Sequence, residues 1–322
     1  MRTAYEAAWS GTVHKVNNTH HVFKTRGGGE CFFQSTYQLL PELEPTPLYP
    51  FRETEGVFDG SPMSAYMREY FQIPLILVAL YVVVIFSGRA VMSCLPAADL
   101  TVPLALWNLA LSLFSWVGVF RTVPHLLGTI AHRGVYFSMC EPVCATFGAS
   151  EVGLWAWLFI ISKIPELIDT VFIVLRKKPL IFLHWYHHVT VLLYCWASYT
   201  TQNSAGLYFI CMNYTVHAIM YGYYFLKAVN MWPRFIPSWT ITLLQLSQMV
   251  GGIVVCYLTY KYEKEDGLPC SISEVAFNTG VVMYGSYFLL FLQILFSLLS
   301  GGKKKSAGRP KADAGLQQKK KQ

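Results

Sequence analysis

Long apolar stretches alternate with short polar connections over most of this chain. A membrane-spanning helix needs roughly 20 mostly apolar residues, and seven stretches of the sequence meet this requirement. The predicted spans are Tyr70–Gly88, Thr101–Phe120, Val152–Leu175, Ile181–Ser198, Ala205–Leu226, Trp239–Tyr260 and Ala276–Leu299. The pattern therefore predicts an all-α polytopic membrane protein with seven transmembrane helices.

The two ends of the chain differ from this hydrophobic block. We expect residues 1–69 to form a separate, partly disordered N-terminal segment, and residues 70–300 to form the seven-span domain. Residues 301–322 are rich in lysine, glycine and alanine, which predicts a disordered basic tail. Residues 121–151 are expected to form a long connection between the second and third spans, with room for a short helix over 124–132.

Composition excludes most other classes of protein. Of the 322 residues, 54% are apolar and only 13% are charged, and the mean hydropathy is +0.38. A soluble domain carries roughly 25% charged residues, so a soluble core, a disordered chain and a disulfide scaffold are all excluded. The net charge of +7 is contributed by the tail, because residues 1–69 sum to −2 and the middle block to +2. The basic balance thus gives no indication of nucleic-acid binding.

The distribution of lysine and arginine predicts the orientation in the membrane. With the C-terminus in the cytosol, the cytosolic loops hold six basic residues, the lumenal loops hold four, and the tail adds eight to the cytosolic side. Basic residues favour the cytosolic side, so residues 1–69 are expected in the lumen. There Asn17 begins an Asn-Asn-Thr glycosylation sequon. The alternative is that the sequon is not glycosylated.

Cysteines and the extreme C-terminus suggest two further features. Cys140, Cys144 and Cys270 fall in predicted lumenal loops, where a disulfide from Cys140 or Cys144 to Cys270 can form. Of these two pairings, we expect Cys140 with Cys270. Lys319 and Lys320 lie four and three positions from the C-terminus. This end resembles a dilysine retrieval signal of endoplasmic-reticulum membrane proteins, and the alternative is a solvated basic tail near anionic lipid.

Polar and ionisable residues inside spans are costly, and they indicate function by default. Here they gather in four spans: Lys163, Glu166 and Asp169; His184, His187 and His188; Asn213, His217, Tyr221 and Tyr224; and Gln245 and Gln248. The three histidines share one helix face. At 1.5 Å per residue, seven of these groups lie about 9–13 Å from the predicted cytosolic ends: Glu166, Asp169, His187, His188, His217, Gln245 and Gln248. The spacing therefore predicts a polar cavity that opens toward the cytosol.

Simpler interpretations apply to each of these residues taken singly. An isolated intramembrane histidine such as His217 is often only hydrogen-bonded to a neighbouring helix. Lys163 and Glu166 could form a purely structural ion pair. Tyr221 and Tyr224 could only pack against their neighbours or line the cavity.

Imidazole groups support either metal binding or acid–base and nucleophilic chemistry. A membrane di-iron desaturase or hydroxylase uses around eight histidines in several boxes. This chain has nine in all, and only four of them belong to the predicted layer, which is too few for a di-iron centre. A mononuclear site stays open on this count, and the expectation is that no metal is bound. A membrane His-box desaturase or hydroxylase, or a non-enzymatic seven-span receptor or lipid transporter, remains the alternative.

Four motifs resemble those of the very-long-chain fatty-acid elongases, the ELO family. They are Lys163-x-x-Glu166-Leu167-x-Asp169-Thr170, His184-x-x-His187-His188, His217-x-x-Met220-Tyr221-x-Tyr223-Tyr224 and Thr242-x-x-Gln245-x-x-Gln248. The resemblance covers roughly residues 70–300. The residues around Trp185 and Asn213 are similar to those of the branch that acts on saturated and monounsaturated acyl chains.

The resemblance implies a seven-span enzyme of the endoplasmic reticulum, with its helices around a closed-ended acyl tunnel. Such an enzyme condenses a long-chain acyl-CoA with malonyl-CoA to a 3-oxoacyl-CoA, releasing CO₂ and CoA, without a cofactor. The expected partners are these two substrates, membrane lipid, and the reductases and dehydratase of the elongation cycle. Homo-oligomer formation is left open.

The resemblance also suggests roles for the residues of this chain. His187 is the expected nucleophile, forming an acyl-imidazole, with His184 and His188 as acid–base or orienting partners. Asn213 and Gln245 would donate to the developing oxyanion, and His217 would hold the reacting carbonyls. Substrate contacts are expected from Lys163, Glu166, Asp169, Tyr221, Tyr224 and Gln248, and contacts to the CoA phosphates from Arg176, Lys177, Lys178, Lys227 and Arg234. The alternative for this basic group is that it serves only as the orientation signal.

Overall fold

The structure is a computed structural model that describes residues 13–17, 20–24, 30–34, 58–233 and 235–307. Three short strands precede the helices: β1 Val13–Asn17, β2 His20–Lys24 and β3 Glu30–Gln34. They pair antiparallel in the order β1-β2-β3, with Val13 opposite Phe23 and His21 opposite Phe33. The N-terminal segment therefore contains a small sheet.

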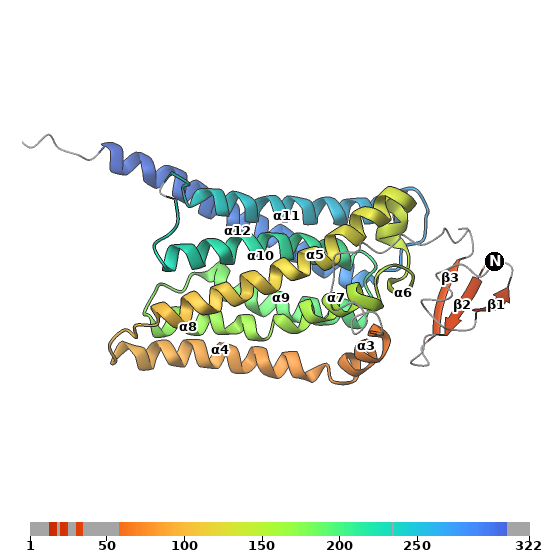
Figure 1. Cartoon of the computed structure of the whole chain (residues 1–322), viewed down its shortest axis with the longest axis horizontal. Coiled ribbons are helices and arrows are strands. Elements are labelled where there is room, and N and C mark those ends of the chain that lie inside the picture. The colour runs from red at the N-terminus through yellow and green to blue at the C-terminus, as the bar shows by residue number, and fades with distance from the viewer. Residues whose placement is uncertain (1–12, 18–19, 25–29, 35–57, 234, 308–322) are drawn as a thin grey trace, which may run out of the picture.

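Helices make up nearly all of the remaining described chain. They are α3 Gly60–Glu69, α4 Gln72–Ser93, α5 Thr101–Cys140, α6 Val143–Thr146, α7 Ser150–Ser162, η1 Pro165–Leu167, α8 Ile168–Leu175, α9 Phe182–Thr200, α10 Gly206–Ala228, α11 Trp239–Tyr260, η2 Lys261–Glu265 and α12 Glu274–Ala307. The long helices lie side by side along one direction (Figure 1). The strands and α3 lie at one end of this bundle, here called the α3 end, and α12 finishes at the opposite end.

Four of the described helices are long and apolar enough to cross a membrane. They are α4, α5, α12 and the continuous helix formed by α11 and η2. Their outer faces carry exposed apolar side chains such as Val83 and Val282, which are 64% and 68% exposed. A helix with an apolar surface of this kind needs lipid rather than water around it, so the chain is a helical membrane protein.

The second predicted span is much longer in the structure than the sequence indicated. Residues 121–140 are not a connection but continue α5 to Cys140, with a kink at Gly134 that divides the helix in two. Pro124 lies inside this helix, and only Gly134, with φ 82°, leaves helical geometry. Thr122 and Thr129 donate to carbonyls one turn back, those of Gly118 and His125. The helix thus continues through Pro124, and its kink comes ten residues later, at Gly134.

Two other elements differ from the predicted boundaries. The third predicted span is interrupted at Pro165, where α7 ends, η1 intervenes and α8 begins. Proline has no N–H group to donate to the preceding turn, which explains the break. The last helix continues to Ala307, into the segment for which the composition predicted disorder.

Close contact between α5 and α10 forms the centre of the bundle. A Cβ atom on Gly118 would lie 2.5 Å from the Tyr214 ring, so only glycine allows the two helices to approach this closely. Tyr214 is 2% exposed, and its hydroxyl donates to the Trp155 carbonyl at 2.9 Å. Ser112 Oγ donates to the Ala218 carbonyl at 2.8 Å. These contacts hold α10 against both α5 and α7.

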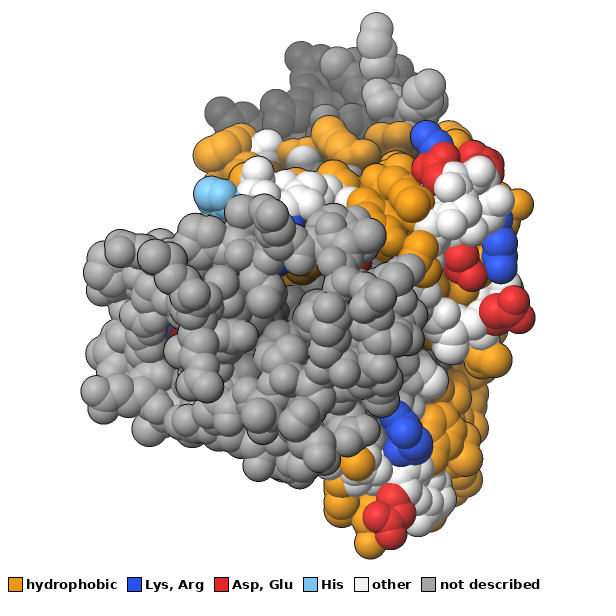
Figure 2. Space-filling view, turned by 90° about the vertical axis from the view of Figure 1, so that its right-hand side faces the viewer, with side chains coloured by type: hydrophobic (Ala, Val, Ile, Leu, Met, Phe, Trp, Pro, Cys, Tyr) orange, Lys and Arg blue, Asp and Glu red, His pale blue; other side chains and the backbone are white. Residues whose placement is uncertain are grey.

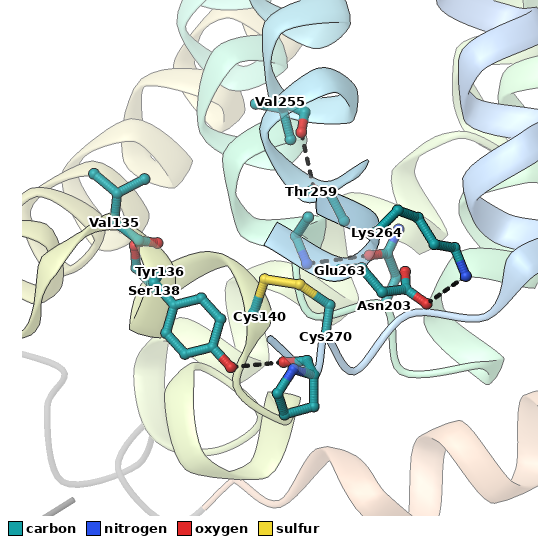
Figure 3. The surroundings of a disulfide bond; sticks show 12 residues. Val135, Tyr136, Ser138, Cys140, Asn203, Val255, Thr259, Glu263, Lys264 and Cys270 are labelled. Atoms are coloured by element: carbon teal, nitrogen blue, oxygen red, sulfur yellow. Dashed lines mark hydrogen bonds and ion pairs between the residues drawn. A yellow bond between two sulfur atoms is a disulfide. The ribbon is translucent and has the colours of Figure 1, made fainter. Parts of the chain in front are cut away.

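A disulfide joins Cys140 at the end of α5 to Cys270 in the loop before α12 (Figure 3). The backbone N–H of Ser271 donates to the Cys140 carbonyl at 2.8 Å, and the Tyr136 hydroxyl donates to the Pro269 carbonyl at 2.7 Å. Figure 2 looks onto the α3 end, where acidic and basic side chains gather beside apolar flanks. The charged end and the apolar sides are what a membrane boundary requires.

Candidate functional site

A cavity of about 670 Å³ lies among α5, α8, α9, α10, α11 and α12. It brings together polar residues that are up to 147 positions apart in the sequence, from Thr101 to Gln248. The residues singled out from the sequence that line it are Glu166, Asp169, Arg176, His184, His187, His188, Asn213, His217, Tyr221, Tyr224, Lys227, Gln245 and Gln248. The four motifs therefore meet at one site.

The first two turns of α9 position three of the histidines. The helix begins at Phe182, after the extended residue Ile181, so His184, His187 and His188 follow at helical spacing. The ring centroids of His184 and His188 lie 4.7 Å apart, and those of His187 and His188 lie 5.5 Å apart. All three side chains line the cavity. Over the described residues, no group of three His, Cys, Asp or Glu side chains has an arrangement that would hold a metal ion.

The three imidazoles have different surroundings. His184 Nε2 lies 2.9 Å from Thr170 Oγ1, so a hydrogen bond restrains its ring. His188 Nδ1 is buried and has no hydrogen-bond partner among the described residues. The His187 ring packs against the Tyr287 ring at a centroid distance of 5.1 Å, and the Tyr287 hydroxyl donates to the His187 carbonyl at 3.3 Å. Aromatic packing thus orients His187.

The break at Pro165 pairs a buried lysine with a buried glutamate. Side chains three positions apart eclipse one another in a 3₁₀ turn, and Lys163 Nζ lies 2.7 Å from Glu166 Oε1. The two side chains are 1% and 4% exposed. Lys163 Nζ also donates to Asn213 Oδ1 at 3.1 Å, whereas Glu166 Oε2 has no hydrogen-bond partner among the described residues. Lys163 itself does not line the cavity and instead holds two residues that do.

Asp169 is held by donors on both carboxylate oxygens. Trp107 Nε1 donates to Oδ1 and the Tyr221 hydroxyl donates to Oδ2, each at 2.6 Å. The Tyr221 ring in turn lies edge-on to the His217 ring, at a centroid distance of 5.2 Å. Because both acceptors of Asp169 are occupied, this carboxylate orders its neighbours rather than offering a free base to a ligand.

The two glutamines of α11 reach the opposite wall of the cavity. Gln245 Nε2 lies 3.1 Å from the Met220 sulfur, which is a weak acceptor. Gln248 is buried, and it also lines the cavity. A weakly held Gln245 amide is available as a donor to a bound ligand.

The basic residues expected at the cytosolic mouth separate into distinct environments. Arg176 and Lys227 line the cavity. Lys177 Nζ donates instead to the Leu95 carbonyl at 2.6 Å, which ties the loop after α8 to the loop after α4. Lys178 is exposed and does not line the cavity.

Arg234, Lys319 and Lys320 lie outside the described residues, and only the backbone of Asn17 is described, as the last residue of β1.

Several residues that contact the site were not found from the sequence. Trp107 supports Asp169 from a helix whose pattern indicates only a membrane span. Asn108 lines the cavity and is 5% exposed, and Tyr287 packs on His187. Asn108 carried a detectable signal, since an amide inside a span is unusual. The two aromatic residues carried none, because aromatic side chains are common in any membrane helix.

Comparison with known proteins identifies the family to which this chain belongs. Residues 66–307 match the profile of the GNS1/SUR4 (ELO) family. A protein named very long chain fatty acid elongase 6 from Drosophila melanogaster is 45% identical over 235 residues, covering 70% of this chain and 72% of the relative. Fatty acid elongase 3 of Trypanosoma brucei brucei is 39% identical over 74% of this chain and 87% of its own length. Human very long chain fatty acid elongase 6 is 37% identical over 79% of this chain and 94% of its own. The matched region contains every helix that lines the histidine cavity, and this chain belongs to the GNS1/SUR4 (ELO) family.

Proposed function

We propose that this protein elongates fatty acyl chains by condensing a long-chain acyl-CoA with malonyl-CoA. The observation that carries the proposal is the single cavity in which the histidines of α9 meet the polar groups of α8, α10 and α11. The products are a 3-oxoacyl-CoA two carbons longer, CO₂ and free CoA. The names of the relatives support elongation, and the residues of the cavity support the condensation chemistry.

His187 is the nucleophile in this proposal. Among the residues that the structure describes, no cysteine or serine side chain lines the cavity, so imidazole is the strongest neutral nucleophile available there. His184 is restrained by Thr170, whereas the described residues make no hydrogen bond to the His187 ring. Its imidazole attacks the thioester carbonyl, the carbon–sulfur bond breaks, and the CoA thiolate leaves with the proton lost from the ring. The acyl group is then carried on the His187 imidazole.

The second half-reaction returns His187 to its starting form. Malonyl-CoA loses CO₂, and the resulting enolate attacks the acyl carbon, forming the new carbon–carbon bond as the carbon–nitrogen bond breaks. The departing imidazole nitrogen takes up one proton from solvent, which restores neutral His187. Developing negative charge on the carbonyl oxygen needs preorganised donors, a role that fits the amides of Asn213 and Gln245. The balance closes without an oxidant, a reductant or a metal, so we propose that no cofactor takes part.

We further propose that the chain crosses the membrane seven times around an acyl tunnel. The three additional crossings are α7 with α8, α9 and α10. At 1.5 Å per residue, α9 and α10 extend about 28 and 35 Å, enough for a bilayer core of about 30 Å. Both helices carry polar side chains that line the cavity, among them His188 and Asn213. An odd number of crossings agrees with the strands and the C-terminal end of α12 lying at opposite ends of the bundle (Figure 1).

The disulfide supports an orientation for these crossings. Disulfides form in oxidising compartments such as the lumen of the endoplasmic reticulum, so the end that holds Cys140 and Cys270 is proposed to be lumenal. The mouth with Arg176 and Lys227 then faces the cytosol, as does the C-terminal tail. We propose residence in the endoplasmic reticulum, alongside the reductases and dehydratase that act on the product.

A condensation assay in membranes tests the function. Membranes that contain the protein are incubated with a long-chain acyl-CoA and radiolabelled malonyl-CoA, and the label recovered in 3-oxoacyl products is measured. His187→Ala is expected to lose this activity with unchanged protein abundance, and mass spectrometry of the wild type without malonyl-CoA should find an acyl group on His187. Full activity in His187→Ala would overturn the nucleophile assignment.

A matched variant separates loss of the nucleophile from general damage. His132 lies on α5 away from the cavity and is exposed, so His132→Ala should retain wild-type activity. Labelled product that is absent from wild-type membranes over a broad range of acyl-CoA lengths would contradict the proposed reaction itself.

A further inference from the structure

Two large apolar side chains are exposed on the loop that joins α10 to α11, at the end of the bundle opposite the α3 end (Figure 1). Residues 229–238 form this loop, and all of them except residue 234 are described. Met231 is 69% exposed and Phe235 is 85% exposed; these two residues are here called the loop patch. Apolar side chains gain free energy when they leave water, so water alone is an unfavourable surrounding for this loop.

The exposure of the loop patch does not come from a loop without internal contacts. Trp232 Nε1 donates to the Ile236 carbonyl at 3.0 Å. The Trp232 ring also packs edge-on against the Tyr223 ring of α10, at a centroid distance of 4.6 Å. Trp232 thus attaches the loop to the bundle, while Met231 and Phe235 on either side of it in the sequence stay exposed.

The same contacts connect the loop to the mouth of the histidine cavity. The Tyr223 hydroxyl, beneath the Trp232 ring, accepts a hydrogen bond from Lys227 Nζ at 2.7 Å, and Lys227 lines the cavity. Ala228, the last residue of α10, also lines it, and the loop begins at the next residue. The loop patch therefore lies close to the entrance that a substrate has to use.

A second segment at the mouth also exposes apolar side chains. Ile181, immediately before α9, lines the cavity and is nevertheless 50% exposed, and Phe182 beside it is 52% exposed. Arg176 and Lys227 add two cations to the lining. Exposed apolar side chains next to cations suit the boundary between lipid tails and phosphate headgroups. The composition of the mouth therefore favours a position at the membrane surface over one in bulk water.

The loop patch is continuous with a surface that already faces lipid. Helix α11 begins at Trp239, four residues after Phe235, and Trp239 is 39% exposed. Tryptophan at the end of a span is typical of the membrane–water interface. One turn further, Leu243 on the outer face of α11 is 47% exposed. This continuity favours lipid, rather than another protein, as the occupant of the loop patch.

We propose that the loop patch inserts into the cytosolic leaflet, and that long-chain acyl-CoA enters the histidine cavity from the membrane surface rather than from the cytosol. An alkyl chain partitions into lipid, which places the CoA phosphates of such a substrate at the level of Arg176 and Lys227. Malonyl-CoA has no long chain and enters from water. The entry route rests on the proposed function, whereas insertion of the loop patch does not.

Thiol labelling tests the insertion. Purified full-length protein is placed in phosphatidylcholine vesicles that hold no other protein, in a Cys94→Ser background that removes an exposed free cysteine. The rate of reaction with a membrane-impermeant maleimide is compared between Phe235→Cys and Lys178→Cys, the latter at an exposed position after α8. Phe235→Cys should react about tenfold more slowly or less. Equal rates would overturn lipid as the occupant and leave the patch to a partner protein.

Elongation kinetics in the same vesicles test the entry route. Met231→Ser combined with Phe235→Ser should raise KM for a long-chain acyl-CoA by about fivefold or more, with kcat and KM for malonyl-CoA unchanged. Phe235→Leu keeps an apolar side chain and should stay near wild type. Val83→Ser removes an exposed apolar side chain of α4 that does not line the cavity, so it should change neither KM. An unchanged KM for acyl-CoA in the double variant, or an equal rise for both substrates, would overturn the route.

The two measurements keep this inference separate from the proposed function. Labelling needs no chemistry, so a wild type that elongates no acyl-CoA would refute the proposed function, while the labelling rates would still decide whether the loop patch inserts. A wild type that elongates acyl-CoA but whose Phe235→Cys variant is labelled as fast as Lys178→Cys would refute the inference alone. If the double serine variant does not fold, as a lower Tm would show, the single substitutions Phe235→Cys for labelling and Phe235→Ser for KM carry the test.

Discussion

The hydroxyl groups of Tyr81 on α4 and Thr170 on α8 lie 2.8 Å apart inside the bundle. The same Thr170 oxygen lies 2.9 Å from His184 Nε2. Three residues from three helices thus form one hydrogen-bonded chain that ends at a cavity histidine. Hydrogen bonds in series polarise one another in a low-dielectric interior, so Tyr81 contributes to the orientation of His184 without touching the cavity.

Removing the Tyr81 hydroxyl should slow the reaction rather than weaken substrate binding. Tyr81→Phe keeps the ring but leaves Thr170 with one partner, a loss of about 0.5–1.5 kcal/mol for a neutral hydrogen bond. If the hydrogen bonds from Tyr81 through Thr170 position His184 for the reaction, kcat falls by about three- to tenfold, with little change in KM for either substrate. Initial rates at varied acyl-CoA and malonyl-CoA concentrations measure both constants.

Two comparisons separate this positioning role from a structural one. Tyr257 on α11 is 56% exposed, so Tyr257→Phe should leave kcat unchanged. Thr170→Ser retains the hydroxyl and should be more active than Thr170→Val. Equal kcat in Tyr81→Phe and wild type would show that the hydrogen bonds from Tyr81 through Thr170 to His184 have no part in the reaction.

Breaking the buried ion pair should destabilise the fold strongly. Lys163→Met removes the cation that lies 2.7 Å from Glu166 Oε1 and leaves a buried carboxylate without its countercharge. Such a change costs about 3–5 kcal/mol, and the loss should appear as a lower Tm in detergent. Adding Glu166→Gln to Lys163→Met should recover part of the Tm, because the unpaired charge is then also gone.

An exposed pair in the same chain provides the control. Lys264 Nζ lies 3.2 Å from Glu263 Oε1, but the two side chains are 50% and 31% exposed. Exposed pairs contribute about 0–1 kcal/mol, so Lys264→Met should leave Tm nearly unchanged. Similar Tm losses for Lys163→Met and Lys264→Met would contradict the importance of burial.

The hydrophobic pattern predicted most helices of this fold, because a membrane forces each span to satisfy its own backbone hydrogen bonds. The ranges for α9, α10 and α11 differ from the predictions by no more than two residues at either end. The pattern missed the extension of α5 beyond Pro124 and the break at Pro165, since a helix can either continue through a proline or end at it. Packing against neighbouring helices decides between them.

Spacing along single helices also predicted which residues share the cavity. Side chains three and four positions apart lie on one face, so His184, His187 and His188 could be grouped without a structure. Contacts between helices could not be predicted, because nothing in the sequence places Trp107 beside Asp169. For the same reason, the sequence does not predict that Lys177 Nζ donates a hydrogen bond to the Leu95 carbonyl.

Trp107 does not line the cavity, but loss of its indole donor should weaken the position of Asp169, which does. Trp107→Phe removes the 2.6 Å hydrogen bond to Asp169 Oδ1, and a hydrogen bond to a charged group is worth about 1.5–3 kcal/mol. We expect a lower Tm and reduced kcat, because the same carboxylate also holds Tyr221. Trp116→Phe, on the same helix and 39% exposed, should change neither, and equal effects of the two substitutions would show that Asp169 does not depend on Trp107.

The cavity mouth should bind CoA phosphates through Arg176 and Lys227, and not through the basic residues beside them. Both side chains line the cavity, and each charge-assisted contact to phosphate is worth about 1.5–3 kcal/mol. Arg176→Ala and Lys227→Ala should therefore each raise KM for malonyl-CoA by about tenfold or more. Added salt screens exposed charges. It should therefore raise the wild-type KM for malonyl-CoA and narrow the difference in KM between wild type and the two variants.

The neighbouring lysines make this prediction selective. Lys178→Ala removes an equal charge from an exposed position and should leave KM unchanged. Lys177→Ala loses the hydrogen bond to Leu95, so it should lower Tm while KM for malonyl-CoA stays near the wild-type value. If all four substitutions raised KM alike, the general positive potential of this membrane face would explain CoA binding, and the two cavity residues would have no specific role.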